Sequence, residues 1–175
     1  MTPLLKNIIV PLFILIFASC VTEDEPENIG ITPGEPLPVF TVSMSDGEII
    51  SSSDLKGKVA VIEFFNTGCK DCRQSLPQFQ LLYEEYKGNP EVCILAISRE
   101  ESEESIIKYW EENELTIPFS PQPDRTVYNL FATVGIPRIF IVDKEGIVRY
   151  AYGDNQRPTA STLTSNIISL LSPNP

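Results

Sequence analysis

Two cysteines, Cys69 and Cys72, are separated by two residues at a point where the sequence changes from a strand pattern to a helix pattern. Residues 59–65 form an apolar, β-prone run before them, and apolar positions at helical spacing follow. A cysteine at the N-terminus of a helix is favoured as a thiolate, because unpaired N–H groups and the helix dipole stabilise negative charge there. A second thiol about one helical turn further on can close a short disulfide ring. This spacing therefore indicates thiol–disulfide exchange, which proceeds through a mixed disulfide.

An acid, Glu63, lies in the middle of this apolar run, six residues before Cys69. A buried carboxyl group is costly unless it is paired or used, and burial raises its pKa toward neutrality. Such a pKa suits general acid–base chemistry, so Glu63 is a candidate catalytic residue. The residues alone leave two alternatives open: Glu63 points outward from a strand edge, or it pairs with Lys58 or Arg138.

The composition argues against several other kinds of chemistry. The chain has 175 residues, of which 42% are hydrophobic, which suits one compact domain. Its net charge of −11 argues against a nucleic-acid partner. It has no histidine, the commonest metal ligand and general base. The four cysteines, which include Cys20 and Cys93, lie in three different contexts, so we expect neither a metal site nor a cofactor. Cys93 lies in an apolar run and is expected to pack as a small hydrophobic side chain.

The N-terminus has the pattern of a targeting segment. Residues 1–19 combine positive charge with an apolar run at 8–18, which is too short for a bilayer that needs about 20 residues. Residues 17–20 resemble the bacterial lipoprotein cleavage box, in which the cysteine, here Cys20, is lipidated. We therefore expect a lipoprotein signal peptide at 1–19; the alternative is a plain signal peptide with an unmodified Cys20.

Residues 20–36 are acidic and rich in proline, so they are predicted to form a flexible tether. Their acidic run also resembles the surface-export signal of lipoproteins from the Bacteroidetes group, but we favour the simpler interpretation, a spacer. The expected location is a lipid anchor in a bacterial membrane, outside the cytoplasm, at the periplasmic face or at the cell surface.

Residues 37–175 are predicted to form one domain of class α/β. Two β-prone runs around Asp46 and Gly47 predict a hairpin. The apolar runs 59–65 and 92–97 do not alternate with polar residues, and a helical pattern joins them, which favours parallel strands covered on both faces. We expect a central mixed sheet flanked by helices, with a helix and a strand inserted in the middle. The remaining predicted elements are a helix or turn at 53–58, helices at 74–86, 101–113, 124–133 and 159–171, and strands at 116–120, 138–142 and 147–152.

Several markers in order resemble the thioredoxin fold, and most closely its exported, membrane-tethered branch, the TlpA/ResA-like thiol-disulfide oxidoreductases of the AhpC/TSA-redoxin superfamily. The similarity covers residues 34–171. The markers are Asp46-Gly47, Gly57-Lys58, the run 64–72 with both cysteines, the helix proline Pro77, and the tripeptide 135–137. The resemblance implies a thioredoxin-like fold for this domain.

The resemblance also implies roles for individual residues. Cys69 corresponds to the attacking thiolate and Cys72 to the buried resolving thiol, while Glu63 matches a buried acid that relays a proton for the resolving thiol. Pro137 matches a cis-proline that faces the disulfide. Ile136, just before it, would offer backbone hydrogen bonds to an extended substrate.

Two positions depart from the family pattern. Gly68 stands where relatives often have a tryptophan, which implies a more open mouth at the substrate-binding site. Lys70 and Asp71 stand between the cysteines, where relatives often have a proline. This change leaves the redox potential, and so the direction of the reaction, unspecified by the resemblance.

The predicted function is thiol–disulfide exchange with exported, cysteine-containing proteins in the reducing direction; a step of cytochrome c maturation, with apocytochrome c as substrate, is one such role. A reductant in an oxidising compartment needs electrons, so we expect a membrane thiol protein as donor. One alternative is a peroxiredoxin-type thiol peroxidase, although Asn66 and Ile62 stand where those enzymes have threonine and proline. The other is a non-catalytic thioredoxin-like binding module in which Cys69 and Cys72 form a structural disulfide.

Overall fold

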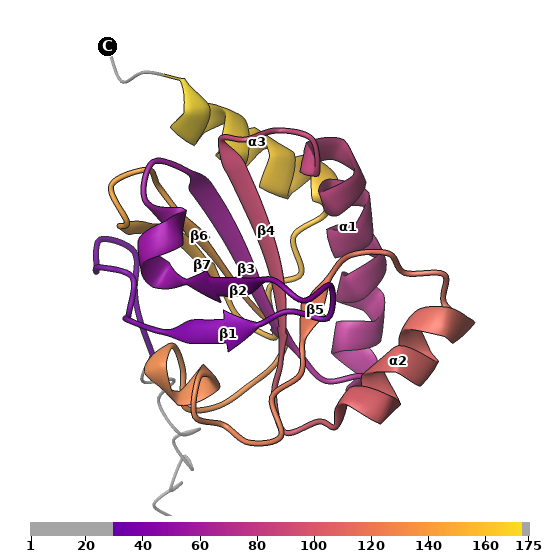
Figure 1. The fold of residues 1–175 in the computed structure, drawn as a ribbon. Helices are drawn as coiled ribbons and strands as arrows, with labels where there is room; N and C mark the ends of the chain where they lie inside the picture. The colour runs from indigo at the N-terminus through magenta and orange to yellow at the C-terminus, as the bar shows by residue number, and fades with distance from the viewer. Residues whose placement is uncertain (1–29, 173–175) are drawn as a thin grey trace, which may run out of the picture.

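A five-stranded sheet lies at the centre of the computed structural model, which describes residues 30–172 (Figure 1). The strand order is β5-β4-β3-β6-β7. Strands β3, β4 and β5 run parallel, whereas β6 and β7 are antiparallel to their neighbours, so the predicted mixed sheet is confirmed. The strands are β3 (Val59–Phe65), β4 (Val92–Ser98), β5 (Phe119–Ser120), β6 (Arg138–Val142) and β7 (Val148–Tyr152).

Helices α1 (Lys70–Tyr86) and α3 (Ala160–Leu171) pack against each other and against one face of the sheet (Figure 1). On α1 the residues Leu76, Phe79 and Leu82 recur at helical spacing and are fully buried. The helix begins directly after Cys69, four residues earlier than the apolar spacing predicts. Its first turn therefore contains the residues between the two cysteines.

An antiparallel hairpin of β1 (Thr41–Ser43) and β2 (Ile49–Ser51) lies over the other face and leads into the 3₁₀ helix η1 (Ser52–Leu55) (Figure 1). The predicted turn is present, with Gly47 at a φ of 91°, a left-handed conformation that favours glycine. Just before β1, the Phe40 ring packs on Phe131, which in turn packs on Phe64 of β3. Aromatic contacts thus attach the hairpin to the centre of the sheet.

The prediction of a helix at 124–133 is wrong. This segment forms turns and one short 3₁₀ helix, η2 (Tyr128–Leu130). Asp124 accepts a hydrogen bond from Thr126 N–H at 2.8 Å, which makes a local turn and not a helix cap. Ala132 is extended, because it forms a β-bridge with Gly30. Tertiary contacts therefore override the local helical pattern.

Residues 30–36, which we expected within the tether, contact the domain. Besides the bridge at Gly30, Pro36 forms a bridge with Ile147, and Gly34 N–H donates to the Val148 carbonyl at 2.8 Å. The folded domain therefore begins before residue 37. The predicted signal peptide and Cys20 lie outside the described residues. No helix in residues 30–172 is long and apolar enough to cross a membrane.

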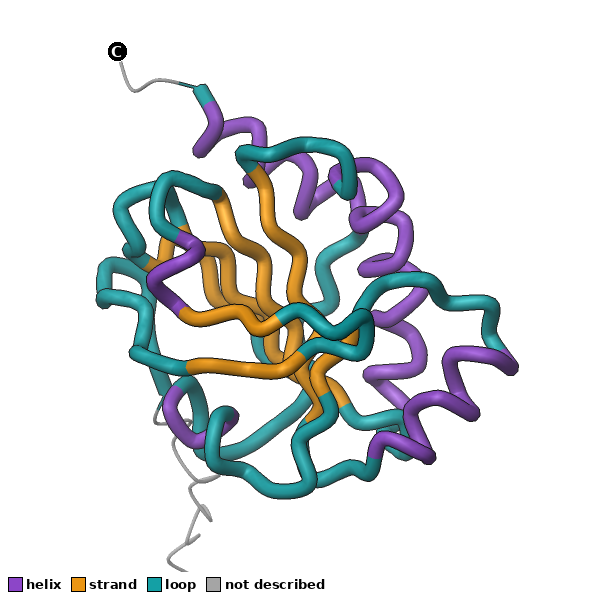
Figure 2. Tube along the Cα trace, viewed as in Figure 1, coloured by secondary structure: helices purple, strands orange, loops and turns teal. Residues whose placement is uncertain are grey.

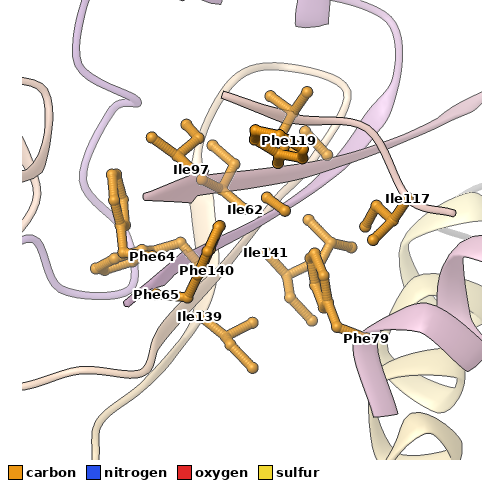
Figure 3. Close-up of a cluster of buried hydrophobic side chains, with 14 of the residues drawn as sticks. Ile62, Phe64, Phe65, Phe79, Ile97, Ile117, Phe119, Ile139, Phe140 and Ile141 are labelled. Carbon is orange, nitrogen blue, oxygen red and sulfur yellow. The ribbon is translucent and has the colours of Figure 1, made fainter. Parts of the chain in front are cut away.

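Strand β3 is buried along its whole length, from the first residue to the last. Figure 3 shows the side chains that surround it: Ile62, Phe64 and Phe65 from β3 lie among residues of β6, of α1 and of the chain around β5. The loops that follow the parallel strands β3, β4 and β5 lie at one end of the sheet, where α1 and α2 (Glu103–Glu112) begin (Figure 2). The two cysteines thus follow directly after a strand that is buried along its whole length.

Candidate active site

The two cysteines occupy different environments at the start of α1. Cys69 is the N-cap residue and half-buried, whereas Cys72 is completely buried. The thiols are not joined to each other. Burial raises the pKa of the Cys72 thiol well above its usual range; the Cys69 thiol beside it and the Glu63 carboxyl group add to this shift, and a backbone hydrogen bond from Asn66 opposes it. This asymmetry fits an accessible attacking thiol and a protected resolving thiol.

Glu63 lies at the centre of the sheet, fully buried on β3. Its neighbours across the sheet are Ala96 on β4 and Ile139 on β6, so it does not point outward from an edge strand. Neither Lys58 nor Arg138 forms an ion pair with it, and among the described residues nothing hydrogen-bonds either carboxyl oxygen. Arg138 instead donates to the Val134 carbonyl. Both alternative explanations of Glu63 are therefore wrong.

Burial raises the pKa of Glu63 to about 8. The hydroxyl of Ser75, which is buried on α1, lowers this pKa in part. It does not form a hydrogen bond with either carboxyl oxygen in this structure. Because Ser75 is three residues after Cys72 on the same helix, Glu63 and the buried thiol share one apolar region beneath the first turn of α1. Glu63 is mostly protonated at pH 7 and can exchange a proton near neutrality.

The Ile136–Pro137 peptide bond is cis, as expected, and it lies next to Cys69. The Cys69 Sγ donates to the Ile136 carbonyl oxygen at 3.6 Å. The loop before it is held by the Tyr128 hydroxyl, which donates to the Gly135 carbonyl at 2.6 Å. The cis-proline loop and the half-buried thiol thus face each other, although they are 67 residues apart in the sequence.

Gly68 is exposed at the entrance, beside Cys69. Its N–H donates to the Asn66 Oδ1 at 2.8 Å, and a Cβ at position 68 would lie 3.0 Å from that same oxygen. A side chain there would have to displace the Asn66 amide. Asn66, Thr67 and Gly68 therefore form a compact turn just before Cys69.

The sequence reasoning missed Glu101. The helix predicted at 101–113 begins only at Glu103, and Glu101, which precedes it, is only 8% exposed. Its carboxyl group accepts hydrogen bonds from the Thr67 N–H, at 2.8 Å, and from the Thr67 hydroxyl. One signal was available: Ser102 is a good N-cap residue, and its side chain does cap the helix, which leaves Glu101 outside it.

A second missed residue is Arg157, in the loop before α3. Its Nη1 lies 3.0 Å from Asp71 Oδ1 and donates to Gln74 Oε1 at 2.6 Å. The acid between the two cysteines is therefore paired, and the first turn of α1 is tied to the C-terminal part of the chain.

Known proteins that are similar to this chain identify its family. Residues 33–151 match the AhpC/TSA family. The chain is 30% identical to the thiol-disulfide oxidoreductase ResA of Bacillus cereus over 66% of either chain, and 31% identical to ResA of Geobacillus kaustophilus over 70% of either chain. The solved structure of a candidate protein disulfide isomerase from Bacteroides thetaiotaomicron is similar with a TM-score of 0.75 and 25% identity, over 82% of this chain and 92% of that one. The chain therefore belongs to the AhpC/TSA family and, within it, to the ResA-like thiol-disulfide oxidoreductases with a thioredoxin-like fold.

Proposed function

We propose that this protein reduces disulfides in exported proteins, with Cys69 as the nucleophile and Cys72 as the resolving thiol. The observation that supports this most directly is the contact of the half-buried Cys69 thiol with the carbonyl next to the cis-proline, while Cys72 is buried behind it. A substrate sulfur can reach the first thiol but not the second. The order of attack follows from this difference in access.

In the first step the Cys69 thiolate attacks one sulfur of the substrate disulfide. A mixed disulfide forms, and the other substrate sulfur leaves as a thiolate that takes up a proton. In the second step Cys72 loses its proton and attacks the Cys69 sulfur. The Cys69–Cys72 disulfide forms and the second substrate sulfur leaves, so two electrons pass from the protein to the substrate.

Glu63 assists the second step. The raised pKa of Cys72 means that this thiol needs a base to ionise, and the carboxyl group of Glu63 in the same buried region is the candidate. In its ionised form Glu63 accepts the proton of Cys72, and in the reverse reaction it returns that proton. A pKa of about 8 keeps both forms of Glu63 available near neutral pH.

The substrate binds as an extended segment along the cis-proline loop. Ile136 is 9% exposed, and its backbone carbonyl already faces the Cys69 sulfur. Pairing of a substrate backbone with this loop would bring a substrate sulfur next to Cys69. The exposed Gly68 leaves room on the opposite side of the thiol.

The setting of this reaction is proposed from the N-terminal sequence. A lipid on Cys20 would anchor the domain to a bacterial membrane outside the cytoplasm, with the acidic segment that follows as a spacer. Because that compartment is oxidising, a membrane thiol protein must return the Cys69–Cys72 disulfide to the dithiol form. Exported proteins such as apocytochrome c are the substrates. Growth with labelled palmitate should label the wild-type protein and not Cys20→Ser; an unlabelled wild type contradicts the anchor.

Insulin reduction with dithiothreitol tests the activity. The wild-type domain should accelerate reduction, and Cys69→Ser should abolish the acceleration. Peroxide consumption without insulin reduction would favour a thiol peroxidase, and the absence of both activities would favour a binding module. The reduction potential of the pair, titrated against glutathione, gives the direction: a potential below the glutathione couple supports a reductase, and a potential near that of strong oxidants contradicts it.

A further inference from the structure

All three polar groups of Thr67, two residues before Cys69, are bound by charged side chains. The N–H donates to Glu101 Oε2 at 2.8 Å, and the hydroxyl donates to Glu101 Oε1. On the other side, the Thr67 carbonyl accepts a hydrogen bond from Arg73 Nε at 2.5 Å. Thr67 is 6% exposed, so these bonds are largely shielded from water.

The two charged residues come from separate parts of the fold and are themselves held. Glu101 N–H donates to the Gln122 carbonyl at 3.0 Å, which fixes the loop between β4 and α2. The Arg73 guanidinium lies over the Tyr109 ring of α2, with 5.7 Å between the guanidinium carbon and the ring centroid. The turn at 66–68 is therefore connected to α1, to α2 and to the loop before α2.

This turn determines where the attacking sulfur lies. Cys69 N–H donates to the Asn66 carbonyl at 3.0 Å, which closes the turn around Thr67. A rotation of the Thr67 backbone would move Cys69 relative to the Ile136 carbonyl, which its sulfur now meets at 3.6 Å. Displacements on the order of 1 Å are enough to slow a reaction about 10²-fold.

We propose that Glu101 and Arg73 are positioning residues, which clamp Thr67 from both sides and so hold the Cys69 sulfur against the cis-proline loop. This inference rests on the proposed exchange reaction. Alkylation of Cys69 can distinguish a positioning role of Glu101 from an effect of its charge on the thiol. Neutralising Glu101 adds no negative charge near the active site, so alkylation of Cys69 should not slow, although the turn is loosened.

The main test compares Glu101→Gln with Glu104→Gln, which removes the same charge at an exposed position of the first turn of α2. Insulin reduction should fall about tenfold in Glu101→Gln and stay unchanged in Glu104→Gln. Alkylation of Cys69 by iodoacetamide at pH 7 should not slow in either variant. A Glu101→Gln rate equal to wild type, or a proportional fall in alkylation and insulin reduction, overturns the inference.

Thr67 supplies an independent pair of variants. Thr67→Val removes the hydroxyl donor and should slow insulin reduction about as much as Glu101→Gln, whereas Thr67→Ser keeps the donor and should retain most of the rate. Equal rates in the two variants contradict the clamp.

Hydrogen exchange of the amides of residues 67–69 provides a readout that does not depend on activity. It should be at least about tenfold faster in Glu101→Gln than in Glu104→Gln. Equal exchange overturns the clamp. If the wild type fails to reduce insulin but the amides respond as expected, the proposed function fails and the clamp stands.

Discussion

Two buried glutamates lie near the cysteines, and they differ in their hydrogen bonding. Glu63, beneath Cys72, has no hydrogen-bond partner among the described residues, and burial raises its pKa to about 8. Glu101, beside the turn that precedes Cys69, uses both carboxyl oxygens to bind Thr67. An acid without partners can change its protonation state near neutral pH, whereas an acid with both oxygens bound serves to hold its neighbours. The same side chain is thus suited to proton transfer in one region and to positioning in the other.

The largest expected effect concerns the attacking thiol, Cys69. Cys69→Ser should lose all insulin reduction, because a hydroxyl cannot form the mixed disulfide. The turbidity assay with dithiothreitol measures this loss. Cys93→Ser is the matched control, since Cys93 lies on β4, away from the cis-proline loop; a comparable loss in that variant would contradict the assignment of the nucleophile.

Glu63→Gln should slow exchange by about tenfold to 10²-fold near pH 7, because the resolving thiol loses its proton acceptor. The rate should also lose its dependence on pH around the pKa of about 8 that burial gives Glu63. Single-turnover kinetics between pH 6 and 9 measure both effects. Glu101→Gln should lower the rate and leave the shape of this profile unchanged. If both variants flatten the profile alike, the contrast between the two acids is lost.

The raised pKa of Glu63 also makes the stability of the fold depend on pH. Between about pH 4.5 and 8 the folded state keeps a proton on Glu63 that the unfolded chain has released. Stability from this group is therefore fully present below pH 4.5 and is lost as the pH rises through 8, by an amount on the order of 5 kcal/mol. Urea unfolding at pH 5 and pH 8 should show this decline in wild type and a smaller one in Glu63→Gln. An equal decline in both proteins would mean that other groups cause it.

The smallest effect is expected from a substitution of Arg157. Its ion pair with Asp71, 3.0 Å between Nη1 and Oδ1, is partly exposed to solvent. Arg157→Gln should slow alkylation of Cys69 about twofold at low salt, because the Asp71 carboxylate is then an uncompensated negative charge in the first turn of α1. The double variant with Asp71→Asn should restore the wild-type rate. An unchanged defect in the double variant would show that Arg157 does not act through Asp71.

Local patterns predicted the parts of the site that lie close together in the sequence, and the family resemblance added the cis-proline Pro137, which is far from Cys69 in the sequence. The strand that ends before Cys69 and the helix that follows were readable from apolar spacing, and the burial of Glu63 from its apolar neighbours. Glu101 and Arg157 were not found, because their partners lie 34 and 86 residues away. The helix predicted after Asp124 failed for the same reason: its end pairs with Gly30, a distant residue. Contacts between distant loops leave no local pattern in the sequence from which they could be predicted.

The central claim, that Cys69 attacks and Cys72 resolves, is tested most directly by trapping the mixed disulfide. Reduced Cys72→Ser protein, mixed with a disulfide substrate such as insulin, should form a covalent adduct at Cys69 that dithiothreitol releases, and mass spectrometry of the digested adduct locates the bond. Cys69→Ser protein should form no adduct, since Cys72 is fully buried. An adduct at Cys72, or none with either variant, would contradict the account.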